Sequence, residues 1–68
     1  MITIKVNSAD RRLESSCLLS EFMDGEGLGD KGGVAVAING RIVRKPQWST
    51  RMIEEGDDII IINAAYGG

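Results

Sequence analysis

The chain has 68 residues, of which 43% are hydrophobic and 26% charged, and its formal net charge is −2. This composition is typical of a folded domain, but a chain this short has too small a core to enclose a deep catalytic cleft, so we do not expect a self-contained enzyme. The acidic balance argues against nucleic acid as a partner, because binding phosphates needs a concentrated basic surface.

Scarce residue types exclude several further classes of function. The sequence has no histidine, which removes histidine-based acid–base catalysis, a serine–histidine triad and the usual zinc sites. One cysteine, Cys17, cannot form an internal disulfide, which fits a reducing compartment. The sequence shows no signal peptide and no apolar run of the ~18 residues that a membrane span needs. We therefore expect a cytoplasmic protein that binds no membrane and holds no metal or cofactor of its own.

The first third of the chain predicts a β-hairpin followed by a helix. Residues 2–6 alternate apolar and polar side chains, which indicates a strand with one buried face. Residues 7–10 predict a turn, and residues 11–14 predict a short second strand. Ser15-Ser16 supplies helix N-cap chemistry. An apolar face follows at helical spacing, formed by Leu18, Leu19, Phe22 and Met23.

A glycine-rich loop, residues 25–33, separates this helix from a second hairpin. Residues 34–38 are continuously apolar, which predicts a central strand buried on both faces. Asn39-Gly40 is a strong signal for a two-residue turn, because that turn requires positive φ at both positions. Residues 41–44 continue as the return strand, which Pro46 ends.

A short excursion leads from the second hairpin to the last strand. We expect Trp48 to be buried against the sheet, and Met52-Ile53 to re-enter the core. Residues 54–57 predict a tight turn. Residues 58–63 include four consecutive isoleucines and predict another strand buried on both faces.

This order of elements predicts an α+β fold of the β-grasp (ubiquitin-like) type. A mixed sheet of four to five strands would pack on one main helix, with the first and last strands paired in parallel. We expect residues 1–63 to form this domain and residues 64–68 to form a flexible C-terminal Gly-Gly tail, since glycine loses more conformational freedom on ordering than any other residue.

Four internal features each have a functional and a structural interpretation. Residues 27–32 match the G-x-G-x-x-G pattern, but dinucleotide binding needs a strand before the loop and a helix after it, and here the order is reversed. Cys17 near a helix start could have a lowered thiol pKa, yet we favour a small buried hydrophobe. The acidic residues Glu54, Glu55, Asp57 and Asp58 favour a solvated turn over a cation site. The basic residues Arg41, Arg44, Lys45 and Arg51 form either a solvated hairpin edge or a docking patch for an acidic partner.

The C-terminal sequence Ala64-Ala65-Tyr66-Gly67-Gly68 is the remaining candidate for chemistry. An ionised carboxylate is a poor electrophile and needs activation. Adenylation by a separate ATP-using enzyme would make a mixed anhydride that a sulfur or nitrogen nucleophile can attack, and a glycine carbonyl is unhindered. Five extended residues span at most ~17 Å, which is enough to enter a partner's pocket.

The sequence closely resembles the thiamine-biosynthesis sulfur carrier (ThiS) family over nearly its whole length. The most specific stretch is residues 34–43, followed by Trp48, then by Gly56-Asp57 before the apolar strand, and by Gly67-Gly68 at the end. The resemblance implies a protein that is not an enzyme but a sulfur carrier used by partner enzymes. ATP would be used by the adenylating partner, and no cofactor would be bound by this chain.

The same resemblance implies particular partners and site residues. A ubiquitin-activating-like enzyme would adenylate the Gly68 carboxylate, which is then converted to a thiocarboxylate. A cysteine desulfurase or another persulfide donor would supply the sulfur, and thiazole synthase would receive it. Carried over by position, Gly68 is the modified residue, and Gly67, Tyr66 and Ala65 bind the partner.

The chain also departs from the family pattern, and alternatives remain open. The family often has Ile-Val-Pro-Arg before its tryptophan, where this chain reads Ile42-Val43-Arg44-Lys45-Pro46, and Tyr66 adds bulk before the glycines. The acceptor of sulfur is therefore thiazole synthase or, with the same chemistry, a molybdopterin-type or other metabolite pathway. From other classes, the chain would be a ubiquitin-like modifier that forms isopeptide bonds with lysines, or a purely structural binding module.

Overall fold

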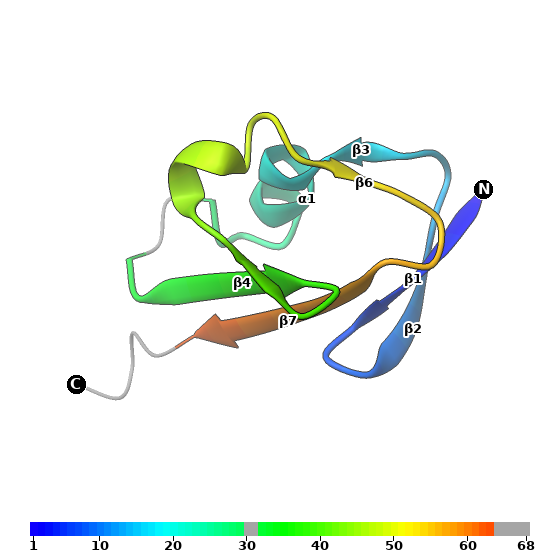
Figure 1. Ribbon diagram of the computed structural model, residues 1–68. Coiled ribbons are helices and arrows are strands. Elements are labelled where there is room, and N and C mark those ends of the chain that lie inside the picture. The colour runs from blue at the N-terminus through cyan, green and yellow to red at the C-terminus, as the bar shows by residue number, and fades with distance from the viewer. Residues whose placement is uncertain (30–31, 64–68) are drawn as a thin grey trace.

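A computed structural model describes residues 1–29 and 32–63 of the chain, in which helix α1 lies across one face of a mixed sheet (Figure 1). The bounds of the strands are β1 (Ile2–Val6), β2 (Ala9–Leu13), β3 (Cys17–Leu18), β4 (Val34–Ile38), β5 (Arg41–Val43), β6 (Met52–Ile53) and β7 (Asp58–Asn63). The helices are α1 (Leu19–Gly25) and the 3-10 helix η1 (Lys45–Gln47).

The main sheet has five strands in the order β2-β1-β7-β4-β5, and β3 and β6 form a separate two-stranded sheet. Strands β1 and β7 pair in parallel, while the other neighbours in the main sheet are antiparallel. This arrangement confirms the predicted β-grasp topology, including the parallel pair of first and last strands. The strand predicted at residues 34–38 is β4, an interior strand that pairs with β7 and β5, although β7 takes the middle position.

Both hairpins of the main sheet turn through two residues. At Asn39-Gly40 the φ angles are 52° and 82°, which confirms the predicted turn. At Asn7-Ser8 they are 52° and 72°, so this turn has the same handedness although it contains no glycine. The predicted turn over residues 7–10 was too long, because Ala9 and Asp10 already pair with β1.

Helix α1 begins later than the serine pair suggested. Cys17 and Leu18 pair with Ile53 and Met52 across the small sheet, so Ser15-Ser16 cannot cap the helix. The capping group is instead the Glu21 carboxylate, whose Oε1 accepts a hydrogen bond of 2.9 Å from the Leu18 backbone N–H. Helix α1 spans seven residues, and in the described part of the chain no helix has the length and apolar character to cross a membrane.

The core lies between the sheet and α1. Its buried side chains come from five of the strands, from α1 and from the segment after η1: Ile4, Leu19, Phe22, Met23, Val36, Ile38, Val43, Trp48, Ile53 and Ile59. Trp48 is only 3% exposed, as predicted, and its Nε1–H donates to the Val43 carbonyl oxygen at 3.0 Å. Met52 is exposed, so only Ile53 of the predicted pair enters the core.

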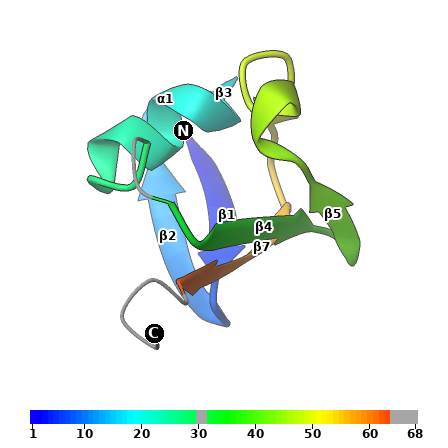
Figure 2. The same cartoon turned by 90° about the vertical axis from the view of Figure 1, so that its left-hand side faces the viewer.

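The main sheet is covered on one face only within the described residues. Figure 2 shows α1 and the segment around η1 on the same side of β4 and β7. Strands β4 and β7 accordingly alternate between buried and accessible side chains. The prediction that both strands are buried on two faces was therefore wrong, since the covering segments all lie on the side of the helix.

Candidate functional site

The predicted site residues Gly68, Gly67, Tyr66 and Ala65 lie outside the described residues, and so does the predicted tail as a whole. The structure does describe the strand that leads to them. Strand β7 ends at Asn63 and is the middle strand of the main sheet, so it is the described element that precedes residue 64 in the chain.

The first hairpin turn, at Asn7-Ser8, holds strand β7 beyond its short pairing with β1. β1 pairs with β7 only at Asp58 and Ile59, after which β1 turns away. Asn7 continues the contact in place of a strand. Its backbone N–H donates to the Ile59 carbonyl at 2.8 Å, and its Oδ1 accepts from the Ile61 N–H at 2.8 Å. The segment of β7 nearest residue 64 is thus held by a turn side chain on one side and by β4 on the other.

A second asparagine fixes the beginning of β7. The backbone N–H of Asn39 donates to the Asp58 carbonyl at 2.8 Å, and its Oδ1 accepts from the Asp58 N–H at 2.9 Å. Its amide Nδ2 donates to Oδ1 of Asp57 at 3.0 Å. The first residue of each hairpin turn therefore holds β7 through its side chain, Asn39 at Asp58 and Asn7 at Ile61.

Asp57 is a structural carboxylate and not part of a solvated turn. Only 7% of the residue is exposed, and its Oδ2 accepts from the Glu54 N–H at 2.9 Å and lies 3.6 Å from Nη2 of Arg51. This contradicts the predicted solvated turn for Asp57, because a buried carboxylate requires such partners. Over residues 1–29 and 32–63, no three His, Cys, Asp or Glu side chains gather in a way that could hold a metal ion.

The uncovered face of the sheet carries a continuous apolar surface, which we call the outer patch. Its members are Ala35, Ala37, Ile42, Ile60 and Ile62. The strand register places Ala37 between Ile42 and Ile60, and Ala35 beside Ile62. Ile42, Ile60 and Ile62 are 66%, 36% and 56% exposed. Contiguous apolar surface of this kind typically marks an interaction site.

The other half of the same sheet face is polar. β1 and β2 direct Thr3, Lys5, Asp10 and Arg12 to this face, since these residues alternate with those that pack on the core. The outer patch is thus confined to β7, β4 and β5, the half that contains the strand leading to residue 64. The sequence predictions missed this patch because they assigned Ile60 and Ile62 to a strand buried on both faces.

Cys17 does not have the environment of a reactive thiol. It is partly buried at the start of β3 and packs against the core. Burial, and next the nearby Glu21 carboxylate, raise the pKa of the Cys17 thiol above its ordinary value. A smaller thiolate fraction means a weaker nucleophile, which supports the interpretation of Cys17 as a small hydrophobe. The loop after α1 leads into strand β4 and not into a helix, as expected when dinucleotide binding was set aside.

Comparisons with known proteins agree with this fold. A family model described as the ThiS family matches residues 4–68. A curated relative described as "Sulfur carrier protein ThiS", from Escherichia coli (strain K12), is 37% identical over 38 residues. That alignment covers 56% of this chain and 58% of the length of the relative.

Two solved structures have a similar fold. The crystal structure of a thiamine biosynthesis protein (ThiS) from Geobacter metallireducens superposes with a TM-score of 0.81 at 16% identity, covering 90% of this chain and 91% of that one. An NMR solution structure of a thiamine biosynthesis protein from the same organism gives a TM-score of 0.75 at 16% identity, covering 90% and 81%. At this identity the likeness shows a shared β-grasp fold.

Proposed function

This chain belongs to the ThiS family, and from that premise we propose that it is a sulfur carrier protein of thiamine biosynthesis. In this role the protein is a cosubstrate of partner enzymes. The observation that carries the proposal is the match of the family model to residues 4–68, because it takes in both the β-grasp domain and the Gly67-Gly68 pair. The similarity to a sulfur carrier from Escherichia coli supports it.

The chemistry would take place at the carboxylate of Gly68. A ubiquitin-activating-like enzyme joins this carboxylate to AMP with release of pyrophosphate, which turns a poor electrophile into a mixed anhydride. The terminal sulfur of a persulfide, supplied by a cysteine desulfurase or another donor, then displaces AMP to give an acyl disulfide. A thiol next cleaves the S–S bond of this intermediate, which releases the thiocarboxylate and leaves a disulfide on the donor. The resulting thiocarboxylate donates its sulfur to thiazole synthase. A glycine carbonyl suits each step because no side chain hinders the approach of the nucleophile.

The described domain supports this proposal because it offers a surface on which a partner enzyme could dock. The outer patch lies on β7 and on β4 and β5 to one side of it, so it includes the strand that leads to residue 64. Covering Ile42, Ile60 and Ile62 would remove their exposed apolar surface from water, which favours association. We propose the adenylating enzyme as the occupant of the patch, with Ala65, Tyr66 and Gly67 extending from the patch into its active site.

Intact-mass spectrometry tests the proposal. The chain is incubated with ATP, the cognate adenylating enzyme and a sulfur donor, and a variant lacking Gly68 serves as the control. We expect a mass gain equal to the exchange of one oxygen atom for sulfur, mapped to Gly68 by fragmentation and missing in the control. No gain with an enzyme that adenylates another carrier under the same conditions would sink the proposal.

The acceptor of the sulfur needs a second measurement. The thiocarboxylated chain is offered to thiazole synthase and, separately, to a molybdopterin synthase subunit. Thiazole formation alone supports the proposed pathway, whereas transfer to the second acceptor supports the alternative carrier role. High-molecular-weight conjugates that disappear when Gly68 is deleted would instead show a protein modifier.

A further inference from the structure

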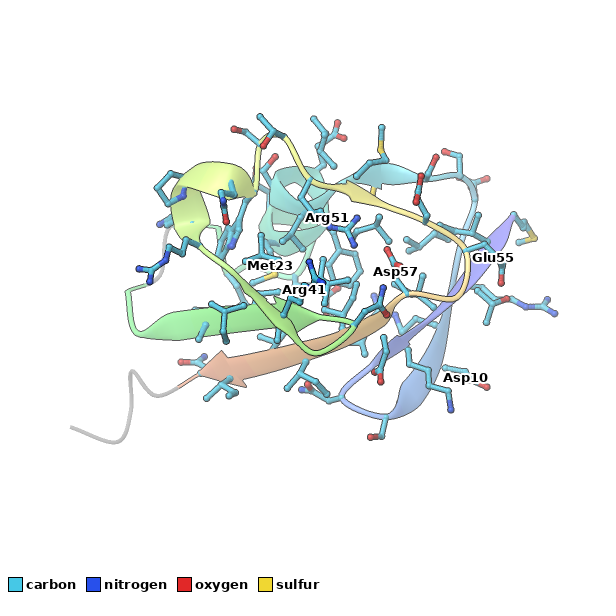
Figure 3. The ribbon with its side chains drawn as sticks, viewed as in Figure 1. Asp10, Met23, Arg41, Arg51, Glu55 and Asp57 are labelled. Atoms are coloured by element: carbon cyan, nitrogen blue, oxygen red, sulfur yellow. The ribbon has the colours of Figure 1, made fainter. Side chains whose placement is uncertain are left out.

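The four basic residues 41, 44, 45 and 51 separate into two groups in the structure. Nζ of Lys45 lies over the Trp48 ring, 5.8 Å from its centroid, and the Arg44 backbone N–H donates to the Gln47 side chain. Arg41 and Arg51, in contrast, line one pocket of about 480 Å³ between the second hairpin and the segment after η1. Figure 3 shows their side chains converging from β5 and from the residue before β6, with Asp57 beside them.

The two arginines differ in how they are held. Arg51 is oriented by Asp57, at 3.6 Å, and its Nη1 also donates to the carbonyl of Met52. The Arg41 guanidinium makes no hydrogen bond and no ion pair with any residue in the described part of the chain. Because Arg51 is paired with Asp57, Arg41 is the lining guanidinium that has no ion-pair partner among the described residues.

The other lining groups match the shape and polarity of a carboxylate side chain. Ile38 and Val43 form an apolar wall. The Gln47 side chain borders the pocket with its oxygen occupied by the Arg44 N–H, so its amide group remains as a donor. A guanidinium presents a planar fork of donors that fits a carboxylate in a bidentate manner. A monoanionic carboxylate also suits a pocket in which one guanidinium, that of Arg41, has no partner in the described part of the chain.

The pocket is continuous with the outer patch. Ile42 belongs to the patch on the outer face and also lines the pocket at the edge strand β5. A protein that covers the patch therefore reaches the pocket mouth at its rim. This arrangement of an apolar centre with a charged rim is common in protein interfaces.

We propose that the Arg41–Arg51 pocket binds an aspartate or glutamate side chain of the adenylating enzyme. The inference rests on the proposed function, since that function supplies the partner. Arg51 is held in place by Asp57 and forms the fixed side of the pocket, and Arg41 supplies the guanidinium that pairs with the incoming carboxylate. The contact adds specificity and association rate to the apolar contact of the patch.

The test compares Arg41→Gln with Arg12→Gln, which removes the same charge from the polar half of the outer sheet face. Calorimetry with the cognate adenylating enzyme measures the dissociation constant of each variant. We expect about a tenfold weakening for Arg41→Gln and less than about twofold for Arg12→Gln. Equal effects of the two substitutions would show that only the overall charge matters and would overturn the proposal.

A kinetic measurement separates this inference from the proposed function. Arg41→Gln should raise the carrier concentration needed for half-maximal adenylation and leave the maximal rate unchanged. If the wild-type chain is never adenylated, the proposed function fails. If the wild type is adenylated and Arg41→Gln behaves like wild type, the function stands and the pocket assignment fails.

Small anions test the chemistry of the pocket directly on the wild-type chain. Acetate should shift the side-chain N–H resonances of Arg41 and Arg51 in NMR spectra in a saturable manner, and Arg41→Gln should abolish the shift at Arg51. Tighter saturation by inorganic phosphate than by acetate would mark a phosphate site and would contradict the carboxylate assignment.

Discussion

The two faces of the main sheet carry the same kinds of side chain in opposite surroundings. On the inner face, Val36, Ile38 and Ile59 are sealed beneath α1 and Trp48. On the outer face, Ile60 and Ile62 come from the same strand as Ile59 but stay exposed. Hydrophobic side chains that alternate along one strand thus serve two purposes. The inner set stabilises the fold, and the outer set is available for a partner.

The largest expected difference between the faces is in stability. Ile59→Ala should lower the free energy of unfolding by about 2–5 kcal/mol, since it leaves a cavity in the core, and Ile60→Ala should cost less than about 1 kcal/mol. Urea denaturation followed by circular dichroism measures both. Because a domain of this size has little stability to lose, Ile59→Val and Ile60→Val provide a milder pair, for which we expect about 0.5–1.5 kcal/mol and nearly zero. A similar loss in both members of a pair would mean that the outer face is covered in solution.

Removing apolar surface from the outer face should weaken binding and leave the fold intact. Ile62→Thr keeps a β-branched residue in the strand and should weaken binding to the adenylating enzyme by about 1–2 kcal/mol, roughly tenfold. Met52→Thr is the matched control, because Met52 is also an exposed apolar residue but lies in the small sheet. Surface plasmon resonance with the immobilised enzyme would compare them. Weaker binding by the Met52 variant than by the Ile62 variant would place the interface elsewhere.

The smallest expected effect concerns the rim of the inner face. Arg11 lies 5.5 Å over the Phe22 ring and donates to both oxygens of Glu26, at 3.2 and 2.9 Å. The hydrogen bond from Arg11 lowers the pKa of the Glu26 carboxyl below its ordinary value of 4.5. Because the Glu26 pKa is lower in the folded chain than in the unfolded chain, the ion pair stabilises the fold at any pH above the unfolded-state pKa. This stabilisation is lost as the pH falls through the folded-state pKa. Both side chains are partly exposed, so the contribution is at most about 1 kcal/mol.

This effect can be isolated with Glu26→Gln. Unfolding free energies of wild type and variant are compared between neutral pH and about pH 3. We expect wild type to be slightly more stable at neutral pH and the gap to close in acid. A gap that is constant with pH would show that the ion pair contributes nothing, while the inner-face packing on Phe22 persists.

Much of the fold could be predicted from local patterns. Alternation in residues 2–6, the Asn39-Gly40 turn and the burial of Trp48 each depend on neighbouring residues, and the structure has all three. The start of the helix could not be predicted in this way. Ser15-Ser16 is a good capping signal by itself, but pairing of residues 17–18 with β6, far along the chain, takes the backbone past it. Long-range strand pairing outweighed a local preference.

The main error of the sequence predictions was to expect the outer face of β4 and β7 to be buried, and the cause of this error is informative. Continuous apolar runs normally indicate strands with both faces covered. Here the described chain has one α-helix and the segment around η1 to cover the sheet, and both lie on the same face. Burial within the described domain therefore explains only half of the isoleucine run of β7, the half that faces α1. It indicates a second cover, which under the proposed function is the partner enzyme.

The candidate site could be predicted only in part. Gly68 and its neighbours follow from the family resemblance, and they lie outside the described residues. The position of Arg41 and Arg51 in one pocket could not be predicted from their spacing in the sequence, because it depends on strand register. Arg41 lies opposite Ile38 and so shares the inner side of the sheet at its edge, where the segment before β6 brings Arg51.

The hydrogen bonds that Asn7 and Asn39 make with β7 have a mechanical consequence. Under the proposed function, an enzyme that draws the chain beyond Asn63 into its active site would put tension along the axis of β7. The hydrogen bonds to β4 and β1 and the Asn7 contacts stand across that axis, so they resist the load together and do not open one after another. A strand loaded in shear between two neighbours is hard to extract. Under the proposed function, this arrangement would keep the domain folded while successive partner enzymes engage the end of the chain.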